Sequence, residues 1–156
     1  MKLLVIDEKN VRQVYAEAGT QLKKQIEEIF PKELISGKIT DRVKTFEDAC
    51  AVLNIDIDWF DSQTQFDSPD ELAFKKMKII VRALNEGWTP NWDNSNERKW
   101  FPWFYLDNPS GFRFGDSLYA YSSSHSAGGS RLCFKTEELC NYAAKQFLPI
   151  YKDLFN

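Results

Sequence analysis

The chain has 156 residues, the common size of one domain, and at that length folding buries roughly 70% of the surface that the unfolded chain exposes. Its formal net charge of −3 argues against binding duplex nucleic acid through the overall field, because neutralising phosphates requires a basic surface. The three cysteines lack metal-type spacing, and the opening apolar run is too short for a secretory leader or a membrane span. We therefore expect reduced thiols in a cytoplasmic protein.

The first predicted helix covers about residues 11 to 30. Apolar side chains recur there at spacings of three and four, from Val11 to Phe30, and lysines and glutamates occupy the other face. The pattern allows a bend near Gly19, and Pro31 ends the helix because the residue before a proline avoids helical geometry.

Two shorter segments carry helix-start signals. Thr45, with Asp48 three residues later, can cap a helix that runs to about Asn54. Ser68, Pro69 and Glu71 form the strongest start in the chain, a capping box with proline in the first turn. Gly87 is placed to end that third helix in a left-handed conformation.

The periodicity changes after residue 87 and predicts a small antiparallel sheet. Residues 100–106 and 112–121 are rich in strand formers, and the turn residues 108–111 between them indicate a hairpin. A third short strand is expected at 131–134. The last helix begins at Thr136, and Pro149 should kink it near residues 145–146. The expected fold is one α+β domain over 1–156, with three N-terminal helices, a three-stranded sheet and a C-terminal helix.

Aromatic side chains are concentrated between Trp88 and Tyr121, which include four of the five tryptophans. Alternation along the first strand places Trp100 and Phe104 on one face and Trp103 and Tyr105 on the other. One face must pack on the helices, and the other needs a cover from this chain, a second protein or a ligand. Internal packing is the favoured interpretation, since the domain has few other large residues for its core.

The remaining chemistry-bearing candidates favour structural interpretations. They are His125 in a serine-rich loop with Asp116 as an acid, the thiols Cys133 and Cys140, glycines at 115–117 and 127–130, and the acidic residues Asp56, Asp58, Asp61, Asp67, Asp70 and Glu71. None matches a nucleophile elbow, a zinc site, a calcium loop or a phosphate-binding loop. We therefore expect no catalytic residue, no metal and no cofactor.

Three sequence blocks between residues 43 and 155 resemble a known family. They are VKTFEDACAVLNI at 43–55, LNEGWTPNW at 84–92 and SRLCFKTEELCNYAAKQFLPIYKDLF at 130–155. In this order they resemble an uncharacterised family of small proteins from phages, prophages and other mobile elements of anaerobic gut bacteria. The resemblance runs from about Thr40 to the C-terminus and implies a mobile-element origin. It implies no activity and transfers no site residue.

The leading functional hypothesis is a non-enzymatic binding or assembly protein that uses aromatic residues for contact with a protein partner or with itself. Single-stranded nucleic-acid binding by stacking on rings is an alternative, and a glycan platform is another. The binding residues expected from the sequence are Trp88, Trp92, Trp100, Trp103, Tyr105, Arg98, Arg113 and Arg131.

Overall fold

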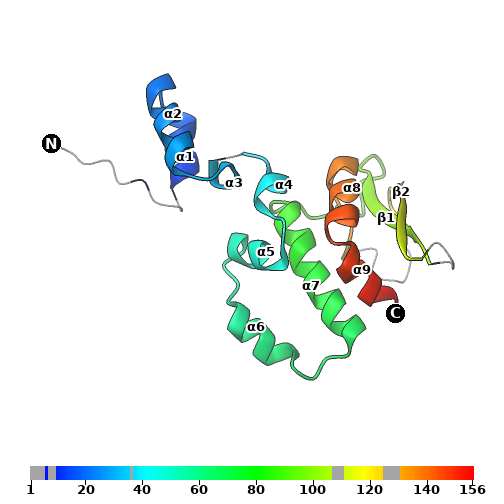
Figure 1. The fold of residues 1–156 in the computed structure, drawn as a ribbon. Helices are drawn as coiled ribbons and strands as arrows, with labels where there is room; N and C mark the ends of the chain where they lie inside the picture. The colour runs from blue at the N-terminus through cyan, green and yellow to red at the C-terminus, as the bar shows by residue number, and fades with distance from the viewer. Residues whose placement is uncertain (1–5, 7–9, 36, 107–110, 125–130) are drawn as a thin grey trace. The chain divides into compact units, whose positions relative to one another are not determined.

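The computed structural model describes residues 6, 10–35, 37–106, 111–124 and 131–156 (Figure 1). The contacts divide the chain into two compact units, an N-terminal unit of residues 1–42 and a C-terminal unit of residues 43–156. The single domain expected over 1–156 stays a prediction.

The N-terminal unit is helical. It contains α1 (Val11–Glu17), α2 (Thr20–Ile29), α3 (Lys32–Ile35) and α4 (Ile39–Arg42). The single helix predicted for residues 11–30 is wrong, because Ala18 and Gly19 are extended and separate α1 from α2. Val11, Ile26 and Ile35 from three of these helices form a small apolar core.

Three helices open the C-terminal unit: α5 (Phe46–Val52), α6 (Ile57–Thr64) and α7 (Pro69–Leu84). The predicted cap of α5 is confirmed, since the Thr45 side chain accepts a hydrogen bond from the Asp48 amide at 3.1 Å. Helix α6 was not expected, because residues 55–58 alternate apolar and acidic side chains as a strand would. Asp56 instead caps α6 by accepting from the Trp59 amide at 3.1 Å.

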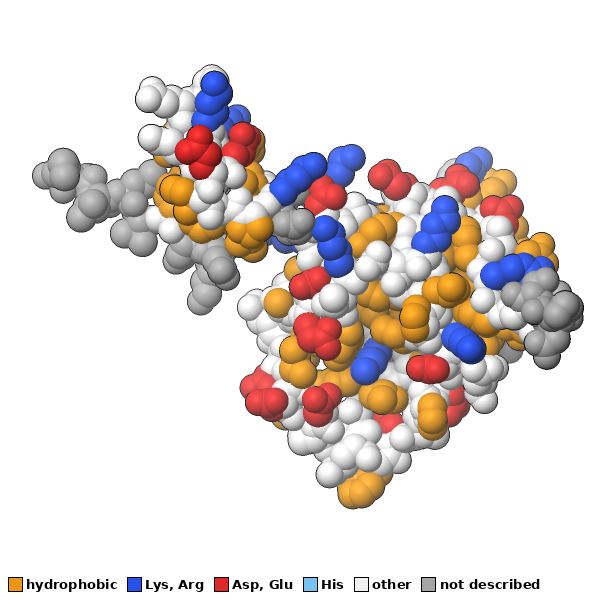
Figure 2. Space-filling view, viewed as in Figure 1, with side chains coloured by type: hydrophobic (Ala, Val, Ile, Leu, Met, Phe, Trp, Pro, Cys, Tyr) orange, Lys and Arg blue, Asp and Glu red, His pale blue; other side chains and the backbone are white. Residues whose placement is uncertain are grey.

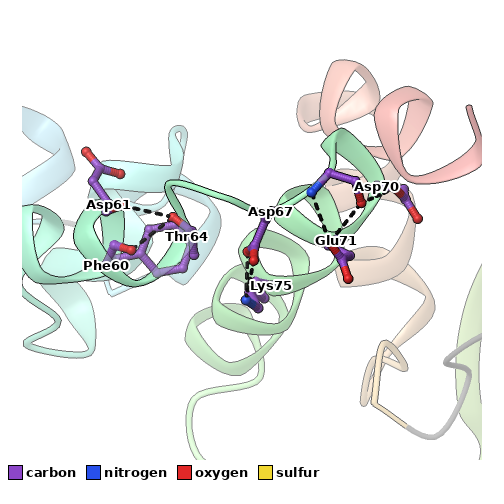
Figure 3. A network of polar contacts seen from close by, with 8 residues as sticks. Phe60, Asp61, Thr64, Asp67, Asp70, Glu71 and Lys75 are labelled. Atoms are coloured by element: carbon purple, nitrogen blue, oxygen red, sulfur yellow. Dashed lines mark hydrogen bonds and ion pairs between the residues drawn. The ribbon is translucent and has the colours of Figure 1, made fainter.

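Hydrogen bonds and an ion pair stabilise the end of α6, the start of α7 and the residues between them (Figure 3). Thr64 at the end of α6 donates to the Phe60 carbonyl at 2.9 Å, and Lys75 of α7 donates to the Asp67 carboxylate at 2.7 Å. The Ser68 amide donates to the Glu71 carboxylate at 2.9 Å, as the predicted capping box requires. Four members of the acidic cluster, Asp56, Asp67, Asp70 and Glu71, therefore serve helix ends and an ion pair.

The sheet is a two-stranded antiparallel hairpin of β1 (Lys99–Tyr105) and β2 (Arg113–Ala120). The predicted third strand is wrong: of residues 131–134, only Phe134 pairs with β1, through a single bridge to Trp100. The segment ends there because Thr136 already caps the next helix by accepting from the Leu139 amide at 3.2 Å. Likewise seven helices, α1 to α7, rather than three precede the sheet in the described residues.

The chain ends in α8 (Glu137–Gln146) and α9 (Leu148–Phe155). The predicted kink is a complete break at Phe147, and Pro149 lies in the first turn of α9, where its missing amide costs nothing. Helix α7 packs against α5 and α9, while α8 packs against both strands (Figure 1). The mixed helix-and-sheet class is therefore confirmed. No helix in the described residues is long and apolar enough to cross a membrane.

Candidate functional site: the aromatic hairpin

The two faces of the hairpin have different surroundings. On the inner face, the Phe104 ring lies 4.7 Å from the Tyr151 ring of α9, measured between centroids. The Ser117 hydroxyl on the same face donates to the Asn141 side chain of α8 at 3.1 Å. The inner face thus packs against the two C-terminal helices.

The opposite face is buried where β1 begins, at Lys99 and Phe101, and carries exposed large side chains further along the strand. We define the hairpin outer face as Trp103, Tyr105, Arg113, Asp116 and Leu118, which the strand register places on one side. Trp103 is 53% exposed, Tyr105 48% and Leu118 47%. Figure 2 shows hydrophobic side chains gathered over the hairpin, with basic side chains beside them. Large exposed apolar groups that share one face are a mark of interaction surfaces.

A β-bulge shapes the outer face. The register shifts between Trp103 and Phe104, which leaves Gly115 of β2 without a partner. A Cβ atom built on Gly115 would lie 2.6 Å from Cε2 of Tyr105, so only glycine leaves room for this ring. The Arg113 guanidinium lies over the same ring, 4.6 Å from its centroid. The bulge therefore holds Tyr105 and Arg113 together at the surface.

A second group of rings lies at the other end of the hairpin; we call Arg98, Trp100, Tyr119 and Tyr121 the Arg98 cluster. The Arg98 guanidinium lies 4.5 Å from the Tyr119 centroid and 6.0 Å from that of Trp100. The hydrogen bond and charge of Arg98 lower the pKa of the Tyr121 phenol. This cluster brings two of the residues expected from the sequence, Arg98 and Trp100, into one place.

Trp92 has a structural role beside a buried lysine. Lys99 is fully buried, and its ammonium group donates to the carbonyl oxygens of Asn94 at 3.1 Å and Glu97 at 2.9 Å. It also pairs with the Glu97 carboxylate at 3.3 Å and lies 5.3 Å from the Trp92 ring centroid. The Asn91 amide is the main cause that lowers the pKa of Glu97, and Lys99 adds to it. Lys99 therefore anchors the segment before β1.

Trp88 and Arg131 belong to a third location, a pocket of about 240 Å³ at the end of α7. The eight residues expected to bind thus separate into groups rather than one site. Trp103, Tyr105 and Arg113 share the outer face, Arg98 and Trp100 the Arg98 cluster, Trp88 and Arg131 the pocket, and Trp92 covers Lys99.

Sequence reasoning missed Leu118, Tyr119 and Tyr121 as parts of these surfaces. Alternation along 112–121 indicates which residues of β2 share a face. It places Leu118 opposite Phe101, and so on the side of Trp103, only when the register of the two strands is known. The bulge at Gly115 hides this register in the sequence, since it shifts the alternation of β2 by one residue.

The described residues contain no group of three His, Cys, Asp or Glu side chains arranged for a metal ion. Burial raises the pKa of the Cys133 thiol to about 11 and that of Cys140 to about 12, so both stay protonated at neutral pH. His125 and the glycines at 127–130 lie outside the described residues. Asp116 lies on the outer face and accepts from the Ser117 amide at 2.8 Å.

Comparison of the chain with protein-family models, with curated proteins and with solved structures produced no match. A function must therefore be inferred from the structure itself, that is, from the aromatic hairpin and the pocket of a small α+β protein. The resemblance to mobile-element proteins stays a prediction.

Proposed function

We propose that this chain is a non-enzymatic binding or assembly protein whose hairpin outer face contacts a partner protein. The observation that carries the proposal is the half exposure of Trp103, Tyr105 and Leu118 on one face. Tryptophan, tyrosine and arginine dominate the energetic centres of protein interfaces, and this face holds one of each. A phage or mobile-element origin and a cytoplasmic location belong to the same proposal and rest on the sequence.

Charge narrows the class of partner. On the hairpin outer face, the Arg113 guanidinium lies over the exposed Tyr105 ring. Elsewhere on the hairpin, Arg98 lies over the exposed Tyr119 ring. We therefore propose a partner surface that presents apolar side chains bordered by carboxylates, which would meet both the rings and their cations.

Chemical crosslinking in the cell followed by mass spectrometry tests this proposal. We expect crosslinks between the hairpin and one partner, and their loss in the double variant Trp103→Ala/Tyr105→Ala. The matched control is Trp59→Ala/Phe66→Ala, which removes two exposed rings at the α6 end of the unit, 60% and 91% exposed. Crosslinks that survive the hairpin variant, or a monomer without hairpin crosslinks, would contradict the proposal.

Single-stranded nucleic-acid binding is a second candidate, favoured by one observation. Two guanidinium groups lie on tyrosine rings, Arg98 on Tyr119 and Arg113 on Tyr105, so cations for phosphates stand beside rings for bases. Such binding should quench tryptophan fluorescence and weaken steeply as salt rises. The absence of any change with oligonucleotides at low salt would remove this candidate, and salt-insensitive quenching by oligosaccharides would favour the glycan alternative instead.

A further inference from the structure

We propose that the pocket at the end of α7 binds a small aromatic anion, a flat ring joined to a phosphate as in a nucleoside monophosphate. The pocket has a volume of about 240 Å³, and its walls include Lys78, Arg82, Trp88 and Arg131. None of these residues belongs to the hairpin outer face. The inference is therefore independent of the proposed partner contact.

A tight turn brings Trp88 to the pocket. After Asn85 ends α7, Glu86 and Gly87 both adopt left-handed conformations, with φ of 50° and 85°. The Trp88 amide then donates to the Asn85 carbonyl at 3.0 Å. The Trp88 side chain also helps to lower the pKa of the Glu97 carboxyl group, so the two side chains lie close together. The ring is thus held as a wall against which a flat ligand can stack.

The second wall of the pocket is the segment that begins at Arg131, and it is joined to α7 through the buried side chain of Asn85. Its side-chain amide donates to the Cys133 carbonyl at 2.9 Å, and its side-chain oxygen accepts from the Lys135 amide at 3.1 Å. These bonds hold the segment from residue 131 beside the last turn of α7. Val81 and Cys133, both buried, line the pocket between the two walls. The pocket is therefore built on fixed backbone.

Three exposed cations line the pocket. Lys78 and Arg82 are four residues apart on α7 and so lie on one side of the helix, and Arg131 comes from the facing segment. In the part of the chain that the structure describes, no ion pair joins Arg82 or Arg131 to a carboxylate. Two carboxylates of the adjoining segments are already paired, Glu86 with Lys135 and Glu97 with Lys99.

Size and charge define the ligand. Pockets for drug-sized ligands begin at roughly 300 Å³, so this pocket suits one ring system and one anionic group, with the rest of the molecule outside. The carbonyl end of α7 carries a partial charge of about −0.5, which three full positive charges outweigh. The two arginines favour phosphate as the anionic group, because one guanidinium group can donate hydrogen bonds to two phosphate oxygens at once.

Calorimetric titration of the full chain with AMP tests the inference, with inorganic phosphate and adenosine as the separate halves of the ligand. We expect AMP to bind, and each half to bind about tenfold or more weakly because it loses either the ring or the charge. Arg82→Gln and Arg131→Gln should each weaken AMP binding by about tenfold, and Trp88→Leu should abolish the preference for AMP over phosphate.

Arg98→Gln is the matched control, since it removes an exposed arginine outside the pocket and should leave AMP binding unchanged. If Arg82→Gln lowers the helical circular dichroism signal, Lys78→Gln replaces it. No AMP binding at millimolar concentration, or equal weakening by Arg98→Gln and the pocket variants, would overturn the inference. Competition with AMP by an oligonucleotide that carries a 5′ phosphate would identify the ligand as the end of a nucleic-acid strand. If this oligonucleotide does not compete, the ligand is a free nucleotide.

Discussion

Both faces of the hairpin carry aromatic rings, yet the two faces differ in what covers them. Phe104 on the inner face lies among the rings of Phe112, Tyr151 and Phe155, with centroids 4.7 to 5.8 Å apart. Trp103, the preceding residue, is more than half exposed. Adjacent residues of similar chemistry thus have different roles, because alternation turns one toward the C-terminal helices and the other away. The aromatic composition of the sequence therefore locates the hairpin, but only the packing of the helices determines which of its faces is exposed.

Phe104→Ala should have the largest effect on stability, since it removes a ring that joins β1 to α9. Phe104 is half-buried, so its replacement by alanine should cost about 3 kcal/mol, the lower end of the range for a buried phenylalanine, and lower the Tm by roughly 10 °C in a thermal melt. A melt unchanged from the wild type would show that the Phe104 ring does not stabilise the packing of β1 on α9.

Lys99→Met should destabilise the chain less, by about 2 kcal/mol in denaturant titration. The substitution keeps the buried volume but removes the donor to the Asn94 and Glu97 carbonyl oxygens and the partner of the Glu97 carboxylate. Lys135→Met, which breaks the partly exposed pair with Glu86, is the control and should change stability by less than about 0.5 kcal/mol. Equal effects of the two variants would contradict a structural role for Lys99.

Acid should weaken the same anchor. Because the pKa of Glu97 is lowered in the folded chain, its contribution is present above the ordinary pKa of glutamate and is lost as pH falls through the lowered value. Glu97→Gln should therefore make stability less dependent on pH in that acidic window. An unchanged slope of unfolding free energy against pH would count against the network around Glu97.

Gly115→Ala should have a small effect on stability, about 1 kcal/mol, and a larger one on the outer face. The new methyl group meets the exposed Tyr105 ring, which can move, and lies 3.3 Å from the Trp103 carbonyl oxygen. We expect Tyr105 to leave the Arg113 guanidinium, which shifts the ring proton resonances in NMR spectra. Ring resonances that stay in place would show that the bulge does not position Tyr105.

Local signals allowed much of the fold to be predicted. The starts of α5, α7 and α8 follow from Thr45, Ser68 and Thr136, whose capping partners lie three residues away. Features set by distant partners were missed or wrong. Asp56 caps a helix although its neighbourhood alternates like a strand, and residues 131–134 form one bridge because only Phe134 meets β1.

The candidate site follows the same division. The sequence identified Trp103, Tyr105 and Arg113 by residue type and alternation. It could not show that Trp92 covers a buried lysine, since Lys99 reads as a solvated charge until its carbonyl partners are seen. The exposure of the outer face likewise depends on where α8 and α9 pack, which no local pattern contains.

Hydroxyl-radical footprinting of the free chain tests the central claim most directly, because it measures the solvent access of individual rings. The account predicts that Trp103 and Tyr105 are oxidised about as readily as exposed Trp59, while Phe104 and Tyr151 are protected. Protection of Trp103 and Tyr105 in a chain that sediments as a monomer would contradict it, since the outer face would then be internal packing.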